Sequence, residues 1–201
     1  MINKKGKAYA NRKSEKERPE SDFYATPKSL VWTLLDECIE IDKSEEIWEP
    51  ACGELAISNV LTDRGYTVTS TDIRRGEDFL SSPRKCNAII TNPPFSLFDE
   101  FVEKAQSCSE KFVFIGKTNF FGAYGRHRDG IWRHLRNLYI FNRQVDYRSP
   151  ARDDGAFHVG NLVTGWFYFD TAWNGGYWST QIVDVQKYAT LGQFKEIDKL
   201  K

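Results

Sequence analysis

The sequence lacks any apolar run that could cross a membrane. Its longest apolar stretches, such as Leu30-Val31-Trp32, are only a few residues long, whereas a membrane helix needs about 20 apolar residues. The first seven residues carry charge with no apolar stretch behind them, so we expect no signal peptide. These absences disfavour membrane and secreted proteins, and we expect a cytoplasmic protein with no membrane partner.

Paired cysteines and clustered histidines are also missing. No Cys-x-x-Cys pair occurs, which disfavours structural zinc and a disulfide framework and favours a reducing compartment. The histidines are scattered through one basic region, which is more typical of surface or substrate contacts than of metal ligands. We therefore expect no metal site. The residues concerned are Cys38, Cys52, Cys86, Cys108, His127, His134 and His158.

The glycine patterns of two large nucleotide-binding classes are absent. There is no Gly-x-Gly-x-x-Gly fingerprint, which disfavours a nicotinamide dehydrogenase, and no phosphate loop ending in Gly-Lys-Ser/Thr. What is present is a chain of 201 residues, 40% hydrophobic and 28% charged, which suits one globular domain. We expect residues 21–201 to form that domain and the polar residues 1–20 to be a mobile tail.

The net charge of zero conceals an uneven distribution. Residues 1–20 carry a balance of +4 and residues 117–152 a balance of +6, which leaves −10 for the rest of the chain. Two basic regions on an acidic body favour a polyanion, such as nucleic acid, that approaches from one side. Solvated charged faces explain the same pattern equally well. Nothing in the pattern indicates an oligomeric state.

Short strands alternate with amphipathic helices along the chain, with order expected to begin near Phe23. Thr26-Pro27 is typical of a helix start, since threonine caps helices and proline suits their first position. Strands are predicted at 46–49, 66–72, 86–91, 111–115 and 138–141, and helices at 54–64, 97–105 and 130–137. Residues 161–169 and 180–185 are predicted to form an antiparallel edge hairpin. This rhythm predicts an α/β fold with a mostly parallel, doubly wound sheet.

Two predicted strand ends carry acidic residues beside small ones. Ligands of open α/β sheets bind beyond the carboxyl ends of the strands. After the first strand comes Glu49-Pro50-Ala51-Cys52-Gly53-Glu54, where small residues admit a ligand and the acid suits a cationic ammonium group. Asp72 ends the next strand, where nucleotide-binding folds hold ribose hydroxyls. A tight turn capped locally by Glu49 and an ordinary junction aspartate are the alternatives.

The third strand end, Asn92-Pro93-Pro94-Phe95, is the most informative motif. Both prolines fix φ and neither can donate a main-chain hydrogen bond, so the loop is rigid and presents mainly carbonyl oxygens. Asn92 adds an acceptor and Phe95 a flat ring that can stack a base. Two acceptors holding the hydrogens of an aryl amine can aim its lone pair at a methyl donor. The motif predicts methylation of an exocyclic amino nitrogen.

With these motifs in place, the sequence resembles the class I amino-methyltransferases, most closely the short DNA N6-adenine methyltransferases of phages and prophages. The quartet at Asn92 is similar to their catalytic (Asn/Asp/Ser)-Pro-Pro-aromatic motif. By the same resemblance, the residues that bind S-adenosylmethionine are Tyr24, Thr26, Pro27, Glu49, Pro50, Ala51, Cys52, Gly53, Asp72, Ile73, Asp78, Phe79 and Leu80. The resemblance covers roughly residues 23–170.

The resemblance implies a Rossmann-like, mostly parallel seven-stranded sheet with helices on both faces and a reversed last strand. It implies direct, metal-free methyl transfer from S-adenosylmethionine to N6 of adenine in DNA, in a bacterial or phage-infected cytoplasm, as in restriction-modification. Methylation of an RNA base or of a protein glutamine, and a non-catalytic nucleic-acid-binding module, are the alternatives. Leu55 stands where the family often has glycine, which departs from its pattern.

The basic region after Gly116 is the expected substrate-recognition element, mainly within residues 117–160. The predicted contacts with the nucleic-acid backbone are Lys117, Arg126, Arg133, Arg136, Arg143, Arg148 and Arg152. Three of these arginines, at positions 126, 133 and 136, are close enough in sequence to share one face of a short helix. Among them, Phe120, Phe121 and Tyr124 are candidates for base stacking, with core packing the alternative for the two phenylalanines.

Overall fold

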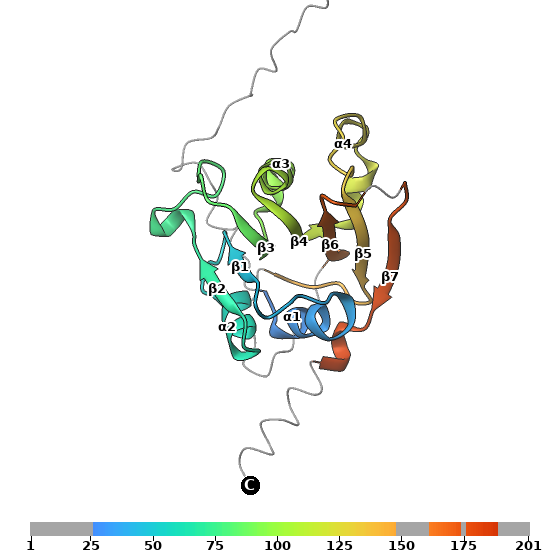
Figure 1. The fold of residues 1–201 in the computed structure, drawn as a ribbon. Helices are drawn as coiled ribbons and strands as arrows, with labels where there is room; N and C mark the ends of the chain where they lie inside the picture. Colours follow the sequence, from blue (N-terminus) through green and yellow to red (C-terminus); the bar gives the residue numbers. More distant parts are fainter. Residues whose placement is uncertain (1–25, 148–160, 174–175, 189–201) are drawn as a thin grey trace, which may run out of the picture.

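The computed structural model describes residues 26–147, 161–173 and 176–188 (Figure 1). The predicted tail at 1–20, the expected start of order at Phe23, and the predicted site residues Tyr24, Arg148 and Arg152 lie outside these ranges. The strands are β1 (Glu46–Glu49), β2 (Thr67–Ser70), β3 (Cys86–Thr91), β4 (Ser109–Lys117), β5 (Leu135–Phe141), β6 (Thr164–Asp170) and β7 (Ser179–Val183).

These seven strands form one sheet in the order β2-β1-β3-β4-β6-β5-β7. Strand β1 is parallel to β2 and β3, β3 is parallel to β4, and β5 is parallel to β7. Strand β6 is antiparallel to both of its neighbours, β4 and β5, so it alone runs against the other six. The prediction of a mostly parallel seven-stranded sheet with one reversed strand is confirmed, but the reversed strand is β6 and not, as predicted, the last strand, because β7 pairs with β5 in parallel.

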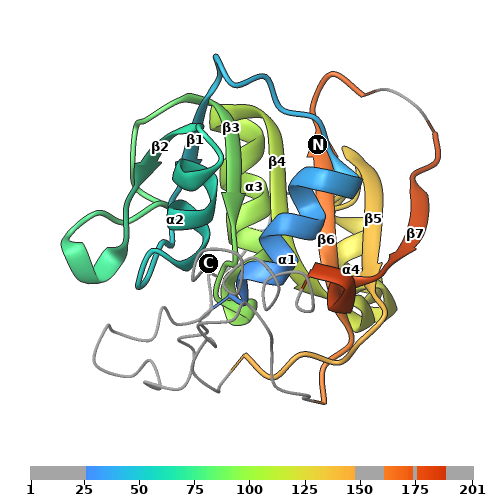
Figure 2. The ribbon, with the colours of Figure 1, turned by 90° about the horizontal axis from the view of Figure 1, so that it is seen from below.

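Helices cover both faces of the sheet, as predicted (Figures 1 and 2). One face carries α1 (Lys28–Thr33), which continues as a π-helical turn over Leu34–Cys38, and α2 (Ala56–Asp63). The other face carries α3 (Phe98–Cys108) and the short α4 (Tyr124–Arg128). Within the described residues, no helix is long and apolar enough to span a bilayer.

Adjacent residues of β6 fix both layers of helices to the sheet. The side chains of Trp166 and Phe167 point to opposite faces, as strand geometry requires, and both are fully buried. The indole Nε1 of Trp166 donates to the carbonyl oxygen of Leu30 in α1 at 2.9 Å. Phe167 packs edge-on against Phe98 of α3, with ring centroids 5.5 Å apart. The central reversed strand therefore holds α1 and α3 in place from opposite sides.

The helix predicted at 130–137 is wrong. After α4 the chain turns at Gly130, whose φ is +77°, and it enters β5 at Leu135. Ile131, Trp132 and Leu135 are spaced as in a helix, but all three are buried and a strand is needed between β6 and β7. Tertiary pairing therefore overrides the local periodicity.

The predicted antiparallel hairpin of the last two strands is also wrong. Both strands exist, but β6 has its two edges occupied by β4 and β5. No edge of β6 is left for β7, which crosses over and pairs with β5 in parallel instead.

Gly165 of β6 should not tolerate a side chain. A Cβ at this position would collide with the backbone carbonyl group of Tyr139 on β5, which the sheet holds in place. We expect Gly165→Ala to destabilise the protein by about 1–3 kcal/mol, which lowers Tm by roughly 2–10 °C. Gly122→Ala is the matched control, because its Cβ would meet no atom within 4 Å. Equal melting temperatures for the two variants would contradict the packing described for β6.

Candidate active site

The three motifs found in the sequence lie at one edge of the sheet. Strands β2, β1 and β3 are neighbours and parallel, so their carboxyl ends meet at that edge. Asp72 follows β2, the loop from Glu49 to Gly53 follows β1, and Asn92 follows β3. Strand adjacency thus brings together residues that are up to 43 positions apart in the chain. We call this the carboxyl edge.

The loop after β1 is braced by the loop after β2. The backbone N–H of Cys52 donates to the carbonyl oxygen of Thr71 at 3.0 Å, and that of Gly53 donates to Oδ2 of Asp72 at 2.9 Å. The other carboxylate oxygen of Asp72 accepts from the backbone N–H of Arg74 at 2.9 Å. Asp72 is buried and therefore shapes the loop around Gly53 from within the protein. Its role as a ribose ligand stays a prediction.

Glu49 is buried at the end of β1, with only 2% of its surface exposed. Its Oε2 accepts from the backbone N–H of Ser58 at 2.8 Å and from the Ser58 hydroxyl, which lies 2.5 Å from the hydroxyl of Ser70. Burial raises the pKa of Glu49 to about 8, against the effect of the Ser58 hydrogen bonds, which lower it. Oε2 of Glu49 thus accepts hydrogen bonds from α2. This is the local capping role that the sequence offered as the alternative to binding a cationic ligand.

Sequence reasoning missed Ser58 and Ser70 as partners of Glu49. The available signal was Ser58 itself, a polar side chain that is buried on α2 between the apolar residues Ile57 and Val60. A buried hydroxyl needs a partner. Its partner, Glu49, lies nine positions earlier in the sequence.

Leu55 has a left-handed backbone, with φ +65° and ψ +24°, immediately before α2 begins at Ala56. This is the position at which the resembled family often has glycine. A non-glycine residue pays roughly 1–2 kcal/mol for this conformation. The loop thus keeps a glycine-like backbone path although it carries leucine.

Asn92 emerges from β3 and contacts the segment that precedes α1. Its Nδ2 donates to the hydroxyl oxygen of Thr26 at 3.2 Å. The two prolines that follow lead directly into a 3-10 turn, Phe95–Leu97, and then into α3. The motif therefore forms a rigid connection between the end of a central strand and the start of a helix.

Phe95 differs from the open stacking ring that its place in the motif predicts. Only 5% of it is exposed, and its ring packs edge-on against Phe120 and Tyr147, with centroids 6.3 and 6.0 Å away. The ammonium group of Lys117, at the end of β4, lies 4.9 Å from the ring centroid. A stacking base would therefore have to displace Lys117 and its neighbours.

The predicted cofactor-binding residues at positions 78–80 are divided between surface and core. Phe79 is buried and packs against Trp48 of β1 and Phe101 of α3, with centroids 5.1 and 4.8 Å apart. Its neighbours Asp78 and Leu80 are half-buried, and Oδ1 of Asp78 accepts from the N–H of Leu80 at 3.1 Å. The predicted cofactor residues that remain are Pro27 and Pro50, which are buried, and Ala51 and Ile73, which are half-buried.

The basic residues do not form the single helical face that was predicted. Arg126 lies on α4 and pairs with Asp99 in the first turn of α3, at 2.6 Å, which places it beside the carboxyl edge. Arg133 lies in the turn before β5, and Arg136 lies at the start of β5, where it pairs with Asp170 at 2.9 Å. The start of β5 is the opposite edge of the sheet. The prediction fails because the helix that would align the three arginines is not formed.

Two other basic residues lie on the same side as Asn92. Lys117 ends β4, and the exposed Arg143 follows the end of β5, which runs parallel to β4. Together with Arg126 they place positive charge around the carboxyl edge. In the part of the chain that the structure describes, no group of three His, Cys, Asp or Glu side chains could hold a metal ion.

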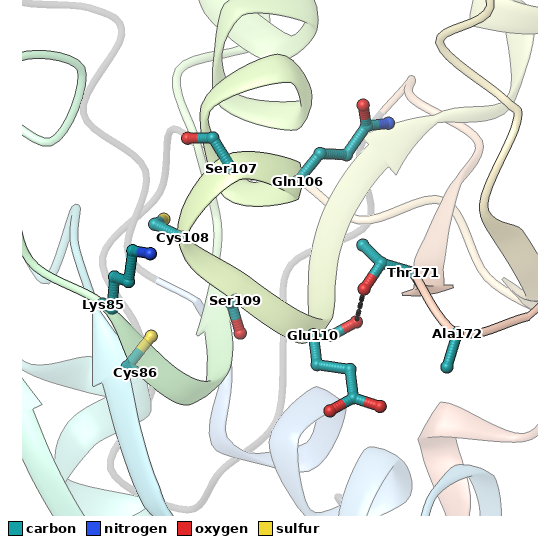
Figure 3. Close-up of a pocket in the computed structure, with 9 residues that line it drawn as sticks. All are labelled: Lys85, Cys86, Gln106, Ser107, Cys108, Ser109, Glu110, Thr171 and Ala172. Atoms are coloured by element: carbon teal, nitrogen blue, oxygen red, sulfur yellow. Dashed lines mark hydrogen bonds between the residues drawn. The ribbon is translucent and has the colours of Figure 1, made fainter.

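A cavity of about 440 Å³ opens at the opposite edge of the sheet (Figure 3). Its walls come from the starts of β3 and β4, the end of α3 and the segment after β6, and the Thr171 hydroxyl donates to the carbonyl of Glu110 at 3.2 Å. Burial raises the pKa of the Cys86 thiol in its wall to about 12. This thiol therefore stays protonated at neutral pH. The cavity lies at the other edge of the sheet and is separate from the motifs of the carboxyl edge.

No protein-family model matches the chain, and no curated protein matches it significantly. Several solved structures do resemble it. A Pyrococcus horikoshii protein, provisionally assigned as an RNA methyltransferase, has a TM-score of 0.51 and 11% identity, with 77% of this chain and 88% of that chain covered. A Vibrio vulnificus protein, provisionally assigned as the modification subunit of a type I restriction enzyme, has a TM-score of 0.52 and 13% identity, with 78% and 45% covered.

The fold is that of the Rossmann-like methyltransferases. Strand order, the single reversed strand and the helices on both faces all agree with this assignment. A Lactococcus lactis protein provisionally assigned as a hemolysin is equally similar, with a TM-score of 0.52 and 9% identity over 85% of this chain and 99% of the other. The methyltransferase fold therefore leaves the activity to be argued from the site.

The buried carboxyl of Glu49 should make stability fall as pH rises. Its pKa is raised from the ordinary 4.5 to about 8, so folding favours the protonated form. The stabilisation is complete below the ordinary pKa and is lost as pH rises through the folded-state value. We expect Glu49→Gln, which stays neutral, to lose less Tm than the parent between about pH 5 and pH 8, with a difference of roughly 5 °C or more.

The control for this measurement is Glu54→Gln, because Glu54 is an exposed acid in the same loop. Thermal melts of the three proteins across the pH range should separate Glu49→Gln from the other two. Parallel curves for all three would mean that Glu49 is ionised in the folded protein.

Proposed function

We propose that this protein transfers a methyl group from S-adenosylmethionine to an exocyclic amino nitrogen, with N6 of adenine in DNA as the main candidate. One observation carries the proposal. The Asn92-Pro93-Pro94-Phe95 loop leaves β3 directly beside the small-residue loop that leaves β1, at the ligand-binding edge of a methyltransferase fold.

The loops after β1 and β2 suit S-adenosylmethionine. Two buried carboxyl groups, Glu49 and Asp72, flank a turn of small residues. Asp72 suits ribose hydroxyls, and a cationic ligand beside Glu49 would favour the ionised form of that carboxyl group and so bind to it. Asp72 and the backbone around Gly53 would hold the ligand from one side, and Pro27 from the other. When bound, the cofactor supplies an electrophilic methyl group on a sulfonium.

The loop after β3 suits the acceptor amine. Its two prolines leave carbonyl oxygens without competing N–H donors, and the side-chain oxygen of Asn92 is a further acceptor. Hydrogen bonds from the amine to these oxygens orient the nitrogen lone pair toward the methyl donor. Methyl transfer would exchange the S–C bond of the donor for the new N–C bond and leave a neutral thioether. The amine would then lose a proton to water, so that the methylated amine is neutral.

Positive charge around the same edge supports a nucleic-acid substrate. Lys117, Arg126 and Arg143 lie at the same edge of the sheet as Asn92, although Arg126 is already paired with Asp99. DNA is favoured by the sequence motifs, and RNA is the second candidate because the Pyrococcus protein with this fold is provisionally assigned to RNA. Incubating the protein with labelled cofactor and duplex DNA, stem-loop RNA or a protein extract separates these substrates. Labelled N6-methyldeoxyadenosine in the DNA digest is the expected result.

Loss of the Asn92 side chain should abolish most turnover. We expect Asn92→Ala to lower kcat by at least ~10²-fold, the scale of removing one preorganised polar group from a transition state. Cofactor affinity, measured by calorimetry, should stay within about twofold, because the side chain faces the amine. Asn87→Ala is the control, since Asn87 is an exposed asparagine of the same strand near its other end. Turnover of Asn92→Ala within a few-fold of the parent would rule out the assigned chemistry.

The charge at the carboxyl edge should determine how DNA binding responds to salt. Each lost phosphate contact reduces the slope of log affinity against log salt concentration by about 0.9. The double variant Lys117→Ala/Arg143→Ala should therefore bind DNA more weakly, with a slope that is smaller by about two units. Lys85→Ala, an exposed lysine at the opposite edge, should change neither quantity. Fluorescence anisotropy at several salt concentrations measures both. A larger effect of Lys85→Ala would place the nucleic acid on the other edge.

A further inference from the structure

The sequence predicts a different role for Thr26 from the one that the structure shows. As the residue before Pro27 it is expected to cap α1, but α1 begins at Lys28 with Pro27 at its N-cap and without a side-chain hydrogen bond there. The Thr26 hydroxyl instead accepts the hydrogen bond from Nδ2 of Asn92, 66 positions away. Only 2% of Thr26 is exposed. The buried hydroxyl of Thr26 therefore binds the side chain of Asn92.

This contact places the Nδ2 end of the Asn92 amide against Thr26. The terminal torsion of asparagine is broad and roughly two-fold, so packing alone separates its two orientations poorly. An amide NH₂ group turned toward an amine would present hydrogens to hydrogens and could accept nothing. With Nδ2 held by Thr26, the oxygen of Asn92 points to the other side of the amide, where an acceptor is needed.

The start of α1, which directly follows Thr26 in the chain, is held against the sheet. The carbonyl oxygen of Pro27 accepts from the N–H of Leu30 at 3.1 Å, and the carbonyl oxygen of Leu30 accepts from the indole of Trp166 at 2.9 Å. Trp166 and Pro27 are buried. Two hydrogen bonds therefore connect the central strand β6 to the start of α1, and the peptide bond between Pro27 and Thr26 extends this connection to the hydroxyl that receives Asn92.

We propose that Thr26 is a positioning residue for methyl transfer, one that orients the Asn92 amide so that its oxygen receives the substrate amine. This inference rests on the proposed function, since it assigns a role within that reaction. It differs from the cofactor-binding role that the sequence resemblance gives to Thr26, because Thr26 acts here through Asn92.

Two substitutions separate the hydroxyl from the bulk of the side chain. Thr26→Val keeps the shape but cannot accept the hydrogen bond, and Thr26→Ser keeps the hydroxyl. A net hydrogen bond is worth about 0.5–1.5 kcal/mol, so we expect Thr26→Val to lower kcat by roughly 3- to 10-fold. KM for the nucleic acid and the Kd of the cofactor should stay within about twofold, and Thr26→Ser should restore most of kcat.

A double-mutant cycle tests whether Thr26 acts through Asn92. In the Asn92→Ala background there is no amide to orient, so adding Thr26→Val should change kcat no further. The same fold-loss in both backgrounds would overturn the proposal. A weaker cofactor Kd with unchanged kcat would do so as well, because it would make Thr26 a cofactor ligand only.

A second readout does not depend on activity. The side-chain NH₂ signals of Asn92 in a ¹⁵N–¹H NMR spectrum can be identified by their loss in Asn92→Ala. We expect these signals to shift in Thr26→Val and to stay close to the parent positions in Thr26→Ser. Unchanged signals in Thr26→Val would overturn the proposal even if methylation is found. Shifted signals in a protein that methylates no substrate would support the contact and refute the proposed function instead.

Discussion

The parallel pairing of β2, β1 and β3 is the constraint on which the candidate site depends. Because the three strands run side by side in one direction, the loops that follow them must emerge at one edge. Two hydrogen bonds then fix the first loop against the second, from Cys52 N–H to the carbonyl of Thr71 and from Gly53 N–H to the carboxylate of Asp72. Leu55, with its left-handed backbone, follows this braced segment and donates its N–H to the carbonyl oxygen of Cys52 at 2.7 Å.

The rest of the fold supports the third loop from behind. Strand β6 holds α1 through Trp166 and α3 through Phe167, and these two helices adjoin Asn92 from either side of the sheet. Gly116 of β4 leaves the space that the rings of Phe98 and Phe167 fill, since a Cβ there would lie 2.8 Å from each. The position of Asn92 is therefore set by packing in both layers and by the contact with Thr26.

Local pattern was enough where an element has clear boundaries. Strands β1 and β3 begin and end as predicted, because each is a short apolar run that a polar or proline-containing turn closes. The Asn92-Pro93-Pro94-Phe95 motif was recognisable for the same reason, since all four of its residues are consecutive. The order of parallel strands then follows from the fold class that these runs indicate.

Features that depend on distant partners could not be read from the sequence. The helical spacing of Ile131, Trp132 and Leu135 was misleading, because only the sheet shows that a strand is needed there. The ion pair between Arg126 and Asp99 joins residues 27 positions apart. This pair reduces the positive charge that Arg126 can offer to phosphates. The burial of the Phe95 ring also depends on contacts with chain segments that no local pattern connects.

The central claim is that the carboxyl edge of β1, β2 and β3 holds the methyl donor beside the acceptor loop. Hydrogen exchange of backbone amides with and without S-adenosylmethionine tests it most directly, residue by residue. We predict slower exchange in the loops at residues 50–55 and 72–75 when the cofactor is added, and no change at residues 170–173, beside the cavity at the opposite edge. Protection that appears only beside that cavity, or no protection at saturating cofactor, would contradict the account.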